Sequence, residues 1–254
     1  LVIIALSIYL YRESTREIRE ASQKVSFVNQ VSHELKTPLT NIRMYAEFLE
    51  RKFAGEERKT KKYLSIIISE TGRLGRLINN VLNFAKDQKN GIVFNPVQLI
   101  PDEIISGLLK SFNYSLISRE IKLYKKLNAS NPVMMDPDIL EQILSNLISN
   151  VEKYAADGKW IKVESSLIDE ILILTVSDRG PGIPDNLKDK IFEPFFRVSN
   201  KLTDGVSGTG IGLALVRTLA EAHGGTVVLL SENIPADDQG AVFEVKLKIS
   251  LEDA

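Results

Sequence analysis

The stretch SHELKTPL, residues 32–39, lies in the middle of a long heptad pattern. Apolar or small side chains recur there at alternating intervals of three and four residues, which is typical of the buried seam of a helix in a bundle. The seam positions are Ile18, Ala21, Val25, Val28, Ser32, Leu35, Leu39, Ile42, Ala46 and Leu49. The sequence therefore predicts a long bundle helix with this stretch at its centre.

His33 is predicted to lie on the flank of that helix. It follows a seam position, and one residue turns a helix by about 100°, so its imidazole points out of the seam. Thr37 is one turn further on the same face, and Glu34 is the next residue. A neutral imidazole is a nucleophile when an acceptor such as Glu34 holds the proton of its other nitrogen. A solvated surface histidine is the alternative, although Pro38 favours a rod that has to bend.

Composition excludes several classes of function. The chain has 254 residues, enough for two modest domains or one large one. Its formal net charge of −1 gives no general attraction to nucleic acid, and we expect no nucleic-acid partner. The absence of cysteine excludes disulfides and cysteine metal ligands, and two histidines are too few for a histidine-rich metal site.

Residues 1–11, LVIIALSIYLY, carry no charge and are about half as long as a membrane-spanning helix. Basic residues follow at once, as expected on the cytoplasmic side of a membrane: Arg12, Arg16 and Arg19. We interpret the stretch as the C-terminal part of a transmembrane helix. The alternative is a coiled-coil segment, because the heptad register continues back into it.

Residues 12–87 are predicted to form a helical hairpin. The first helix ends near Lys52, residues 53–57 form a short break, and a second heptad run extends from Leu64 to Ala85. One hairpin cannot bury both seams, whereas two copies can do so as a four-helix bundle. A homodimer is therefore expected.

Residues 88–254 are predicted to form an α/β sandwich, with a mixed sheet covered by helices on one face. Strands and helices alternate in this part of the sequence. The predicted strands are 92–94, 121–127, 160–167, 171–177, 226–230 and 242–249. The predicted helices are 102–112, 136–156 and 210–223.

Two stretches of this region carry side chains suited to binding a nucleotide. In residues 142–154, Asn146 and Asn150 share one helix face with Lys153 nearby, and amide oxygens suit a Mg²⁺ that also binds phosphates. In DRGPGIP, residues 178–184, Asp178 can accept from an amino group beside a glycine turn. A solvated polar face and an ordinary loop are the alternatives.

Two further stretches frame a polar loop. IFEPFFR, residues 191–197, is predicted to form an apolar plug, with Arg197 as a candidate phosphate contact. The alternative is that it only anchors the polar loop 198–207, which is a candidate lid. GTGIGLA, residues 208–214, places glycines at the start of a helix, whose N-terminal amides can bind an anion. The stretch lacks the lysine of a P-loop and the preceding strand of a dinucleotide fold.

In this order, the stretches resemble the sequence boxes of the sensor histidine kinases of two-component signalling. HELKTPL at 33–39 is similar to the phosphoacceptor box, and NLISNVEKY at 146–154 to the N box. DRGPGIP at 178–184 is similar to the G1 box, FEPFFR at 192–197 to the F box, and GTGIGLAL at 208–215 to the G2 box.

The resemblance implies an α+β multidomain protein, in which a dimeric phosphotransfer hairpin precedes an ATP-binding domain of the Bergerat type. It implies that His33 accepts the phosphoryl group, that Glu34 is its base and that Thr37 belongs to a phosphatase signature. It also implies a Mg²⁺ on Asn150. The ATP-binding residues that it implies are Asn146, Asn150, Lys153, Tyr154, Asp178, Gly180, Gly182, Ile183, Phe195, Arg197, Gly208, Thr209, Gly210, Gly212 and Leu213.

The expected function is that of a homodimeric sensor histidine kinase, anchored in the bacterial inner membrane by its N-terminal helix, with its kinase region in the cytoplasm. It uses ATP and Mg²⁺ to phosphorylate His33 and passes the group to an aspartate of a response regulator receiver domain, which it also dephosphorylates. Related ATPases have a glutamate at the position of Asn146, and an amide cannot activate water. An ATP switch of the gyrase type and an inactive scaffold are the alternatives.

Overall fold

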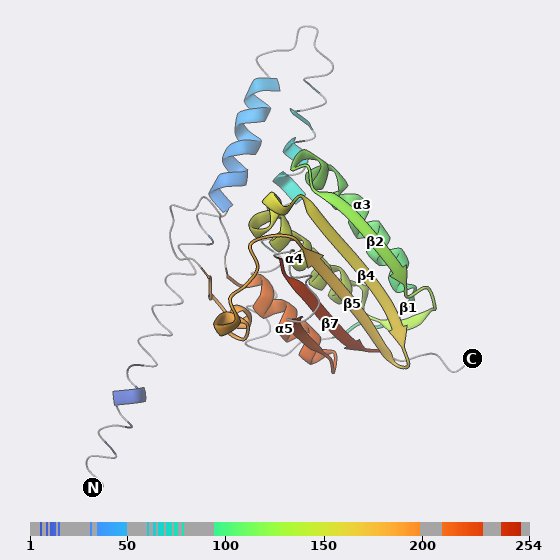
Figure 1. Cartoon of the computed structure of the whole chain (residues 1–254). Helices are drawn as coiled ribbons and strands as arrows, with labels where there is room; N and C mark the ends of the chain where they lie inside the picture. Colours follow the sequence, from blue (N-terminus) through green and yellow to red (C-terminus); the bar gives the residue numbers. More distant parts are fainter. Residues whose placement is uncertain are drawn as a thin grey trace. The chain divides into compact units, whose positions relative to one another are not determined.

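The structure is a computed structural model. It describes residues 94–198, 210–230 and 240–249, the helical residues 35–49, and single positions or short runs between 6 and 31 and between 60 and 78. The chain divides into two compact units, Leu1–Ile78 and Asn79–Ala254 (Figure 1). His33, Glu34 and the predicted break at 53–57 lie outside the described residues.

The first unit contains an antiparallel pair of helical segments. Residues 35–49 form one helix, and the described positions from 60 to 78 are also helical. Tyr45 and Phe48 stack on Tyr63, with ring centroids 5.5 and 6.0 Å apart. Asn41 Nδ2 donates to Glu70 Oε1 at 3.4 Å. Tyr63 contacts Phe48, whereas Glu70, later in the second segment, contacts Asn41, earlier in the first. The two segments therefore run antiparallel, as the heptad pattern predicts.

None of the helices in the described part of the chain is long and apolar enough to cross a membrane. Of the predicted transmembrane stretch, only Leu6, Tyr9 and Tyr11 are described, and all three side chains are exposed.

The second unit is built on a five-stranded mixed sheet of order β2-β4-β5-β7-β6. Its strands are β2 (Lys122–Asn128), β4 (Trp160–Ile168), β5 (Ile171–Asp178), β6 (Thr226–Leu230) and β7 (Val242–Lys248). β2 pairs parallel with β4, and the other pairs are antiparallel. A separate two-stranded sheet joins β1 (Val97–Leu99) to β3 (Val133–Met135).

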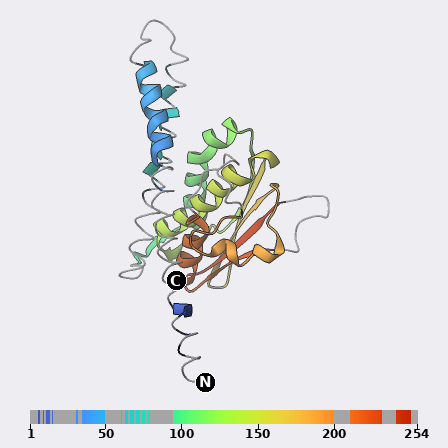
Figure 2. The same cartoon turned by 90° about the vertical axis from the view of Figure 1, so that its left-hand side faces the viewer.

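Three helices lie on one face of this sheet, behind it in Figure 1 and to one side of it in Figure 2. They are α3 (Pro101–Ser118), α4 (Pro137–Tyr154) and α5 (Gly212–Ala222), and single 3-10 turns lie at Ala156–Gly158, Asp185–Leu187 and Lys190–Phe192. The start of α4 agrees with the sequence: Asp136 accepts a hydrogen bond from Asp138 N, and Pro137 occupies the first turn.

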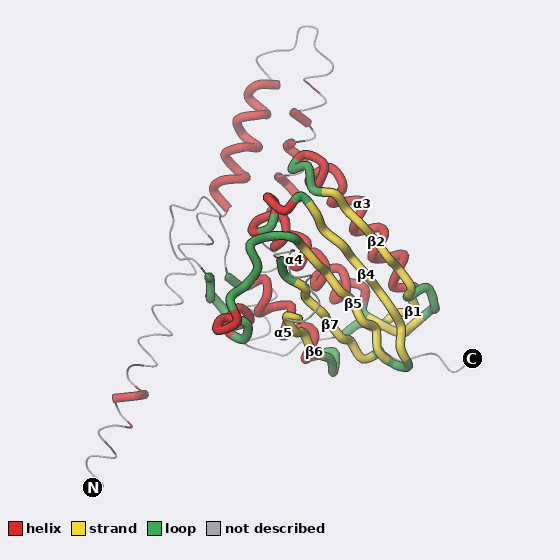
Figure 3. Tube along the Cα trace, viewed as in Figure 1, coloured by secondary structure: helices red, strands yellow, loops and turns green. Residues whose placement is uncertain are grey.

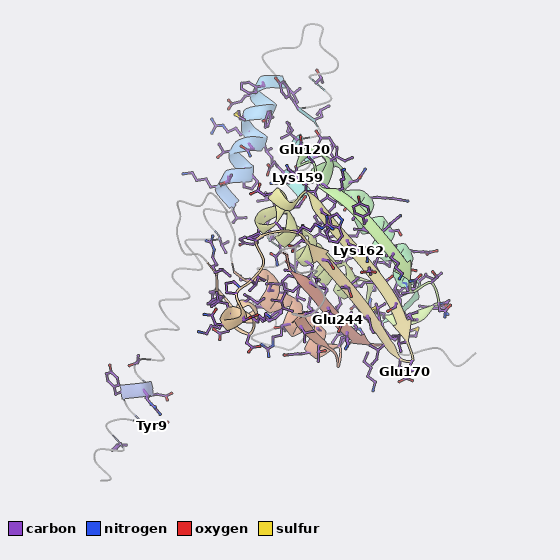
Figure 4. The ribbon with its side chains drawn as sticks, in the orientation of Figure 1. Tyr9, Glu120, Lys159, Lys162, Glu170 and Glu244 are labelled. Atoms are coloured by element: carbon purple, nitrogen blue, oxygen red, sulfur yellow. The ribbon has the colours of Figure 1, made fainter. Side chains whose placement is uncertain are left out.

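Buried side chains alternate along the strands and face the helices. They include Ile161 and Val163 on β4, and Leu172 and Leu174 on β5. The opposite face carries charged pairs: Lys162 pairs with Glu164 at 2.8 Å, and Lys246 with Glu244 at 3.1 Å. Figure 4 labels Lys162 and Glu244. The core therefore lies between the sheet and the helices, as predicted, and Figure 3 shows this layering in the Cα trace.

Three predicted elements need correction. Phe94 lies outside any strand, and the first strand is β1, because Val97–Leu99 has β3 to pair with. The helix predicted over 102–112 continues to Ser118, since Phe112 and Leu116 are both buried against the core. The helix predicted from Gly210 begins at Gly212, because Gly210 has φ +68°, which is not helical.

Asp102, which sequence reasoning did not single out, ties α3 to the sheet. Its buried carboxylate accepts from Ala129 N at 2.9 Å, Ser130 Oγ at 2.8 Å and Ser165 Oγ at 2.6 Å. Buried polar groups without partners are costly, so the three donors and the carboxylate depend on one another.

We expect Asp102→Ala to lower the free energy of unfolding by roughly 2–4 kcal/mol, because it leaves the buried Ala129 amide and the buried Ser165 hydroxyl without this acceptor. Urea denaturation followed by circular dichroism measures this. The matched control is Glu103→Ala, one residue along in the same helical turn and exposed, which should change little. Equal effects of the two substitutions would contradict the role of the network.

Candidate active site

The predicted metal ligands meet the first residue of α5. Asn146 is only 5% exposed, and its Nδ2 donates to the Gln142 carbonyl at 2.9 Å. A Cβ built on Gly212 would lie 3.2 Å from Asn146 Oδ1 and 3.9 Å from Asn150 Oδ1. Both amide oxygens of α4 therefore converge on the start of α5, and the missing side chain at Gly212 leaves room for Asn146 Oδ1.

The N-terminus of α5 presents backbone amides beside these oxygens, and no side chain of the residue before the helix caps them. The preceding residue is Ile211, whose side chain cannot cap the helix, and the first backbone bond into this turn runs from Leu215 N to Ile211 O. The amides of the first turn and the helix dipole favour an anion here. Amide oxygens beside an anion site are the donor set that suits Mg²⁺ bound with phosphates, and Asn150 with Asn146 could hold it.

Asp178 ends β5 on the helix side of the sheet, in phase with Leu174 and Val176. Its Oδ1 accepts from Gly180 N at 2.8 Å and from Ala241 N at 3.2 Å. Burial raises the pKa of the Asp178 carboxyl, and the two backbone donors lower it by less. The carboxylate is thus oriented through one oxygen, and its geometry suits accepting from an amino group through the other.

Close backbone approaches build the turn around Asp178. A Cβ on Gly180 would lie 2.6 Å from the Cβ of Ala155, which follows α4. Gly182 has φ +73° and lies beside the carbonyl of Gly240, just before β7. Ala155 and Gly240 were missed by sequence reasoning, because neither belongs to a local motif and only the folded chain brings them to the turn.

One helix therefore spaces the two halves of the site. Asn150 faces Gly212, whereas Ala155, five residues on, contacts Gly180. At 1.5 Å per residue these points are about 8 Å apart along the helix direction. The helix thus holds two groups at a fixed separation: the turn with the Asp178 carboxylate, which suits an amino group, and the amides of Asn146 and Asn150 beside the anion site. This separation suits an elongated nucleotide.

The ends of the loop between the two remaining motifs are joined. Phe195 N donates to the Gly210 carbonyl at 2.9 Å, and a Cβ on Gly210 would lie 2.9 Å from the Phe195 backbone. Phe192 is buried and packs edge-on against Phe243, with centroids 6.3 Å apart, whereas Phe195 and Phe196 are half-buried, so the predicted apolar plug is buried at Phe192. Residues 199–209, including Gly208 and Thr209, lie outside the described residues.

The other predicted site residues lie at the margins of this arrangement. Lys153 and Tyr154 are in the last turn of α4, and Leu213 is in the first turn of α5. Ile183 and Arg197 are half-buried, one before and one after the two 3-10 turns at Asp185–Leu187 and Lys190–Phe192. Thr37 is exposed on the helix of residues 35–49.

These features define the α/β ATP-binding domain shared by histidine kinases, gyrase B and HSP90. Residues 135–251 match the family described as "Histidine kinase-, DNA gyrase B-, and HSP90-like ATPase". Residues 23–90 match the "His Kinase A (phospho-acceptor) domain". The chain belongs to the sensor histidine kinases.

Individual relatives agree with this assignment. The sensor histidine kinase WalK of Bacillus subtilis (strain 168) is 29% identical over 242 residues, covering 94% of this chain and 39% of WalK. The chain thus spans about two fifths of the length of this relative. Full-length ShkA in complex with AMPPNP has a TM-score of 0.61 at 26% identity, covering 90% of this chain and 46% of ShkA. The histidine kinase ThkA, in complex with the response regulator TrrA, shares the fold with a TM-score of 0.56 at 24% identity, covering 94% of this chain and 66% of ThkA.

We expect Gly212→Ala to weaken Mg²⁺-dependent nucleotide binding by roughly tenfold, because its methyl group would lie 3.2 Å from Asn146 Oδ1 and push this oxygen away from the metal. Calorimetry with and without Mg²⁺ measures the effect. Gly107→Ala is the matched control, since a Cβ there meets nothing within 4 Å. Unchanged Mg²⁺-dependent binding in Gly212→Ala would show that the metal site lies elsewhere.

The pH dependence of stability tests the environment of Asp178. A pKa raised on folding means that the folded state binds the proton more tightly, so stability rises as pH falls through that pKa. Asp178→Asn keeps an acceptor for Gly180 N and carries no charge. We expect the variant to be more stable than the wild type at neutral pH, with a difference that shrinks on acidification. Urea denaturation at several pH values decides this, and a difference independent of pH would contradict it.

Proposed function

We propose that this chain is the kinase part of a homodimeric sensor histidine kinase, which transfers the γ-phosphoryl group of ATP to His33 and then to an aspartate of a response regulator receiver domain. The observation that carries the proposal is the convergence of Asn146 and Asn150 Oδ1 on the N-terminus of α5. It supports a phosphate and metal site in a chain whose residues 23–90 match a phospho-acceptor domain.

The residues at the phosphate end support transfer over hydrolysis. Asn146 carries a buried amide whose Nδ2 already donates to a backbone carbonyl. An amide cannot remove a proton from water, so the site lacks a general base at this position. Phosphoryl transfer needs mainly positioning and stabilisation of charge, which the amides of α5 supply and to which bound Mg²⁺ would add its charge.

At the other end of the site, Asp178 is proposed to accept from the amino group of adenine. Gly180 and Ala241 fix its carboxylate on the helix side of the sheet. His33, with Glu34 accepting the proton of its second nitrogen, is proposed as the nucleophile.

The first unit supports the proposed homodimer. Its described residues expose apolar side chains that a single hairpin leaves open, with Leu39 at 59% and Ile68 at 71% exposure. The other exposed apolar residues of these segments are Met44, Phe48, Leu64 and Ile78. A second hairpin covers such seams in a four-helix bundle. We further propose that residues 1–11 are the end of a transmembrane helix in the cell membrane, supported by the apolar run and the arginines that follow it.

Replacing His33 by Ala should abolish phosphorylation of the chain and leave ATP binding unchanged, because the nucleophile belongs to a different unit from the nucleotide site. Phosphorylation is measured as label transferred from ATP to the chain, and label that is lost in acid but stable in base identifies phosphohistidine. Calorimetry measures ATP binding. Asp178→Ala is the matched variant, in which ATP binding itself should be lost. Acid-labile label on the His33→Ala chain would overturn the assignment.

Thr37 is proposed to act in dephosphorylation of the regulator. It is exposed on the helix of residues 35–49, one turn after His33, and its hydroxyl can orient a water molecule without acting as a strong base. We expect Thr37→Ala to retain autophosphorylation and to slow the loss of label from a phosphorylated regulator. The control is Thr40→Ala, an exposed threonine whose Oγ1 donates to the Lys36 carbonyl. Equal rates for wild type and Thr37→Ala would exclude this role.

A further inference from the structure

Phe94, the first residue described after the segment 79–93, contacts the far end of the helix that begins at the phosphate site. Its ring packs against the imidazole of His223, with centroids 5.4 Å apart and ring planes at 86°. A perpendicular arrangement is favourable because the positive edge of one ring meets the negative face of the other. His223 is the residue at which α5 ends.

A second contact fixes the imidazole of His223. Its Nδ1 lies 2.7 Å from the carbonyl oxygen of Lys248, the last residue of β7. Because a carbonyl oxygen only accepts, Nδ1 is the donor in this hydrogen bond. The side chain of His223 therefore joins the end of α5 to the sheet on one side and to Phe94 on the other.

The next residue of the chain is bonded to the start of α4. Asn95 N donates to Asp136 Oδ2 at 2.9 Å, while Oδ1 of the same carboxylate caps α4 by accepting from Asp138 N. Asp136 is only 6% exposed. Phe94 and Asn95 are consecutive, so one short stretch of chain contacts both the end of α5 and the start of α4. We call these two contacts the clasp.

The clasp and the phosphate end of the site lie at opposite ends of the same two helices. α4 and α5 pack against each other, and the start of α5 lies against Asn146 and Asn150. From Asp136 to Asn146, and from His223 back to Gly212, each helix rises about 15 Å. Since helices are stiff, a displacement of α5 at the clasp also moves Gly212 relative to the amide oxygens.

We propose that Phe94 is a positioning residue: through His223 it holds α5 where Gly212 faces Asn146 and Asn150. The chain that precedes Phe94 and the bound phosphates would then act on one another through α5. Such coupling between two sites is reciprocal. This inference rests on the nucleotide site proposed above and adds to it a second place in the fold that controls nucleotide affinity.

The first test compares ligands that reach different ends of the site, with affinities measured in the whole chain. Phe94→Leu keeps apolar volume but loses the ring, and should weaken binding of ATP with Mg²⁺ roughly two- to tenfold, the range of an aromatic pair. Adenosine, which has no phosphates, should bind as to the wild type. Phe94→Tyr should restore the affinity for ATP. The control is Tyr114→Leu, an exposed ring on α3, which should change neither ligand.

The second test uses the reciprocity. The chain has two histidines, so in the His33→Ala chain a single imidazole signal reports on His223 by nuclear magnetic resonance at fixed pH. ATP with Mg²⁺ should shift this signal, and adenosine should leave it unchanged. The shift should be smaller when Phe94→Leu is added.

Several outcomes would overturn the proposal. Wild-type affinity for ATP in Phe94→Leu would do so, and so would equal weakening of ATP and adenosine, because a general loss of packing affects both ligands. If ATP with Mg²⁺ shifts the Gly212 amide but not the His223 imidazole, the nucleotide site stands and the clasp is excluded. If ATP leaves the Gly212 amide unchanged, the proposed nucleotide site is itself wrong.

Discussion

The site depends on the close approach of the start of α5 to the amide oxygens of α4. A Cβ on Gly212 would lie 3.2 Å from Asn146 Oδ1, which is a tight contact, and 3.9 Å from Asn150 Oδ1, which is an ordinary one, so a glycine at this position favours the approach. This contact places backbone donors beside oxygen ligands, which is the combination that a metal-bound phosphate chain requires. The same helix, α4, ends at Tyr154, and Gly180 packs against the next residue, Ala155. The spacing between the two ends of the site is therefore fixed by one rigid element, while the loop between Phe195 and Gly210 is tied at its ends.

Asp178 shows the conflict between stability and function at the other end of the site. Burial raises the pKa of its carboxyl, so the folded chain at neutral pH carries a charge that the surroundings disfavour. The backbone donors of Gly180 and Ala241 offset part of this cost and orient the group. The guanidinium of Arg179, the next residue, lies 4.8 Å from the centroid of the Trp160 ring. A carboxylate that is kept partly buried and oriented has unsatisfied capacity for a ligand, which suits recognition of an amino group.

Local pattern predicted most of the second unit. Alternation along 160–167 and 171–177 predicted the central strands, and Asp136 predicted the start of α4, because these signals depend on neighbouring residues only. The pattern failed where tertiary contacts decide: β1 exists because β3 pairs with it, and α3 is longer because Leu116 is buried. In the site, the motif residues were predictable, whereas Ala155, Gly240 and Trp160 come to the turn only through the fold. No local sequence signal indicates these three.

The central claim is that the metal-bound phosphates lie at the Asn150 end of α4 and the base at the Ala155 end. Paramagnetic relaxation by Mn²⁺ bound with ATP measures this directly in the isotope-labelled chain, since broadening falls steeply with distance from the metal. The account predicts that the Asn150 side-chain amide and the Gly212 backbone amide broaden most, and that the Gly180 amide broadens less while still shifting on nucleotide binding. Strongest broadening at Gly180, or equal broadening along α4, would contradict it.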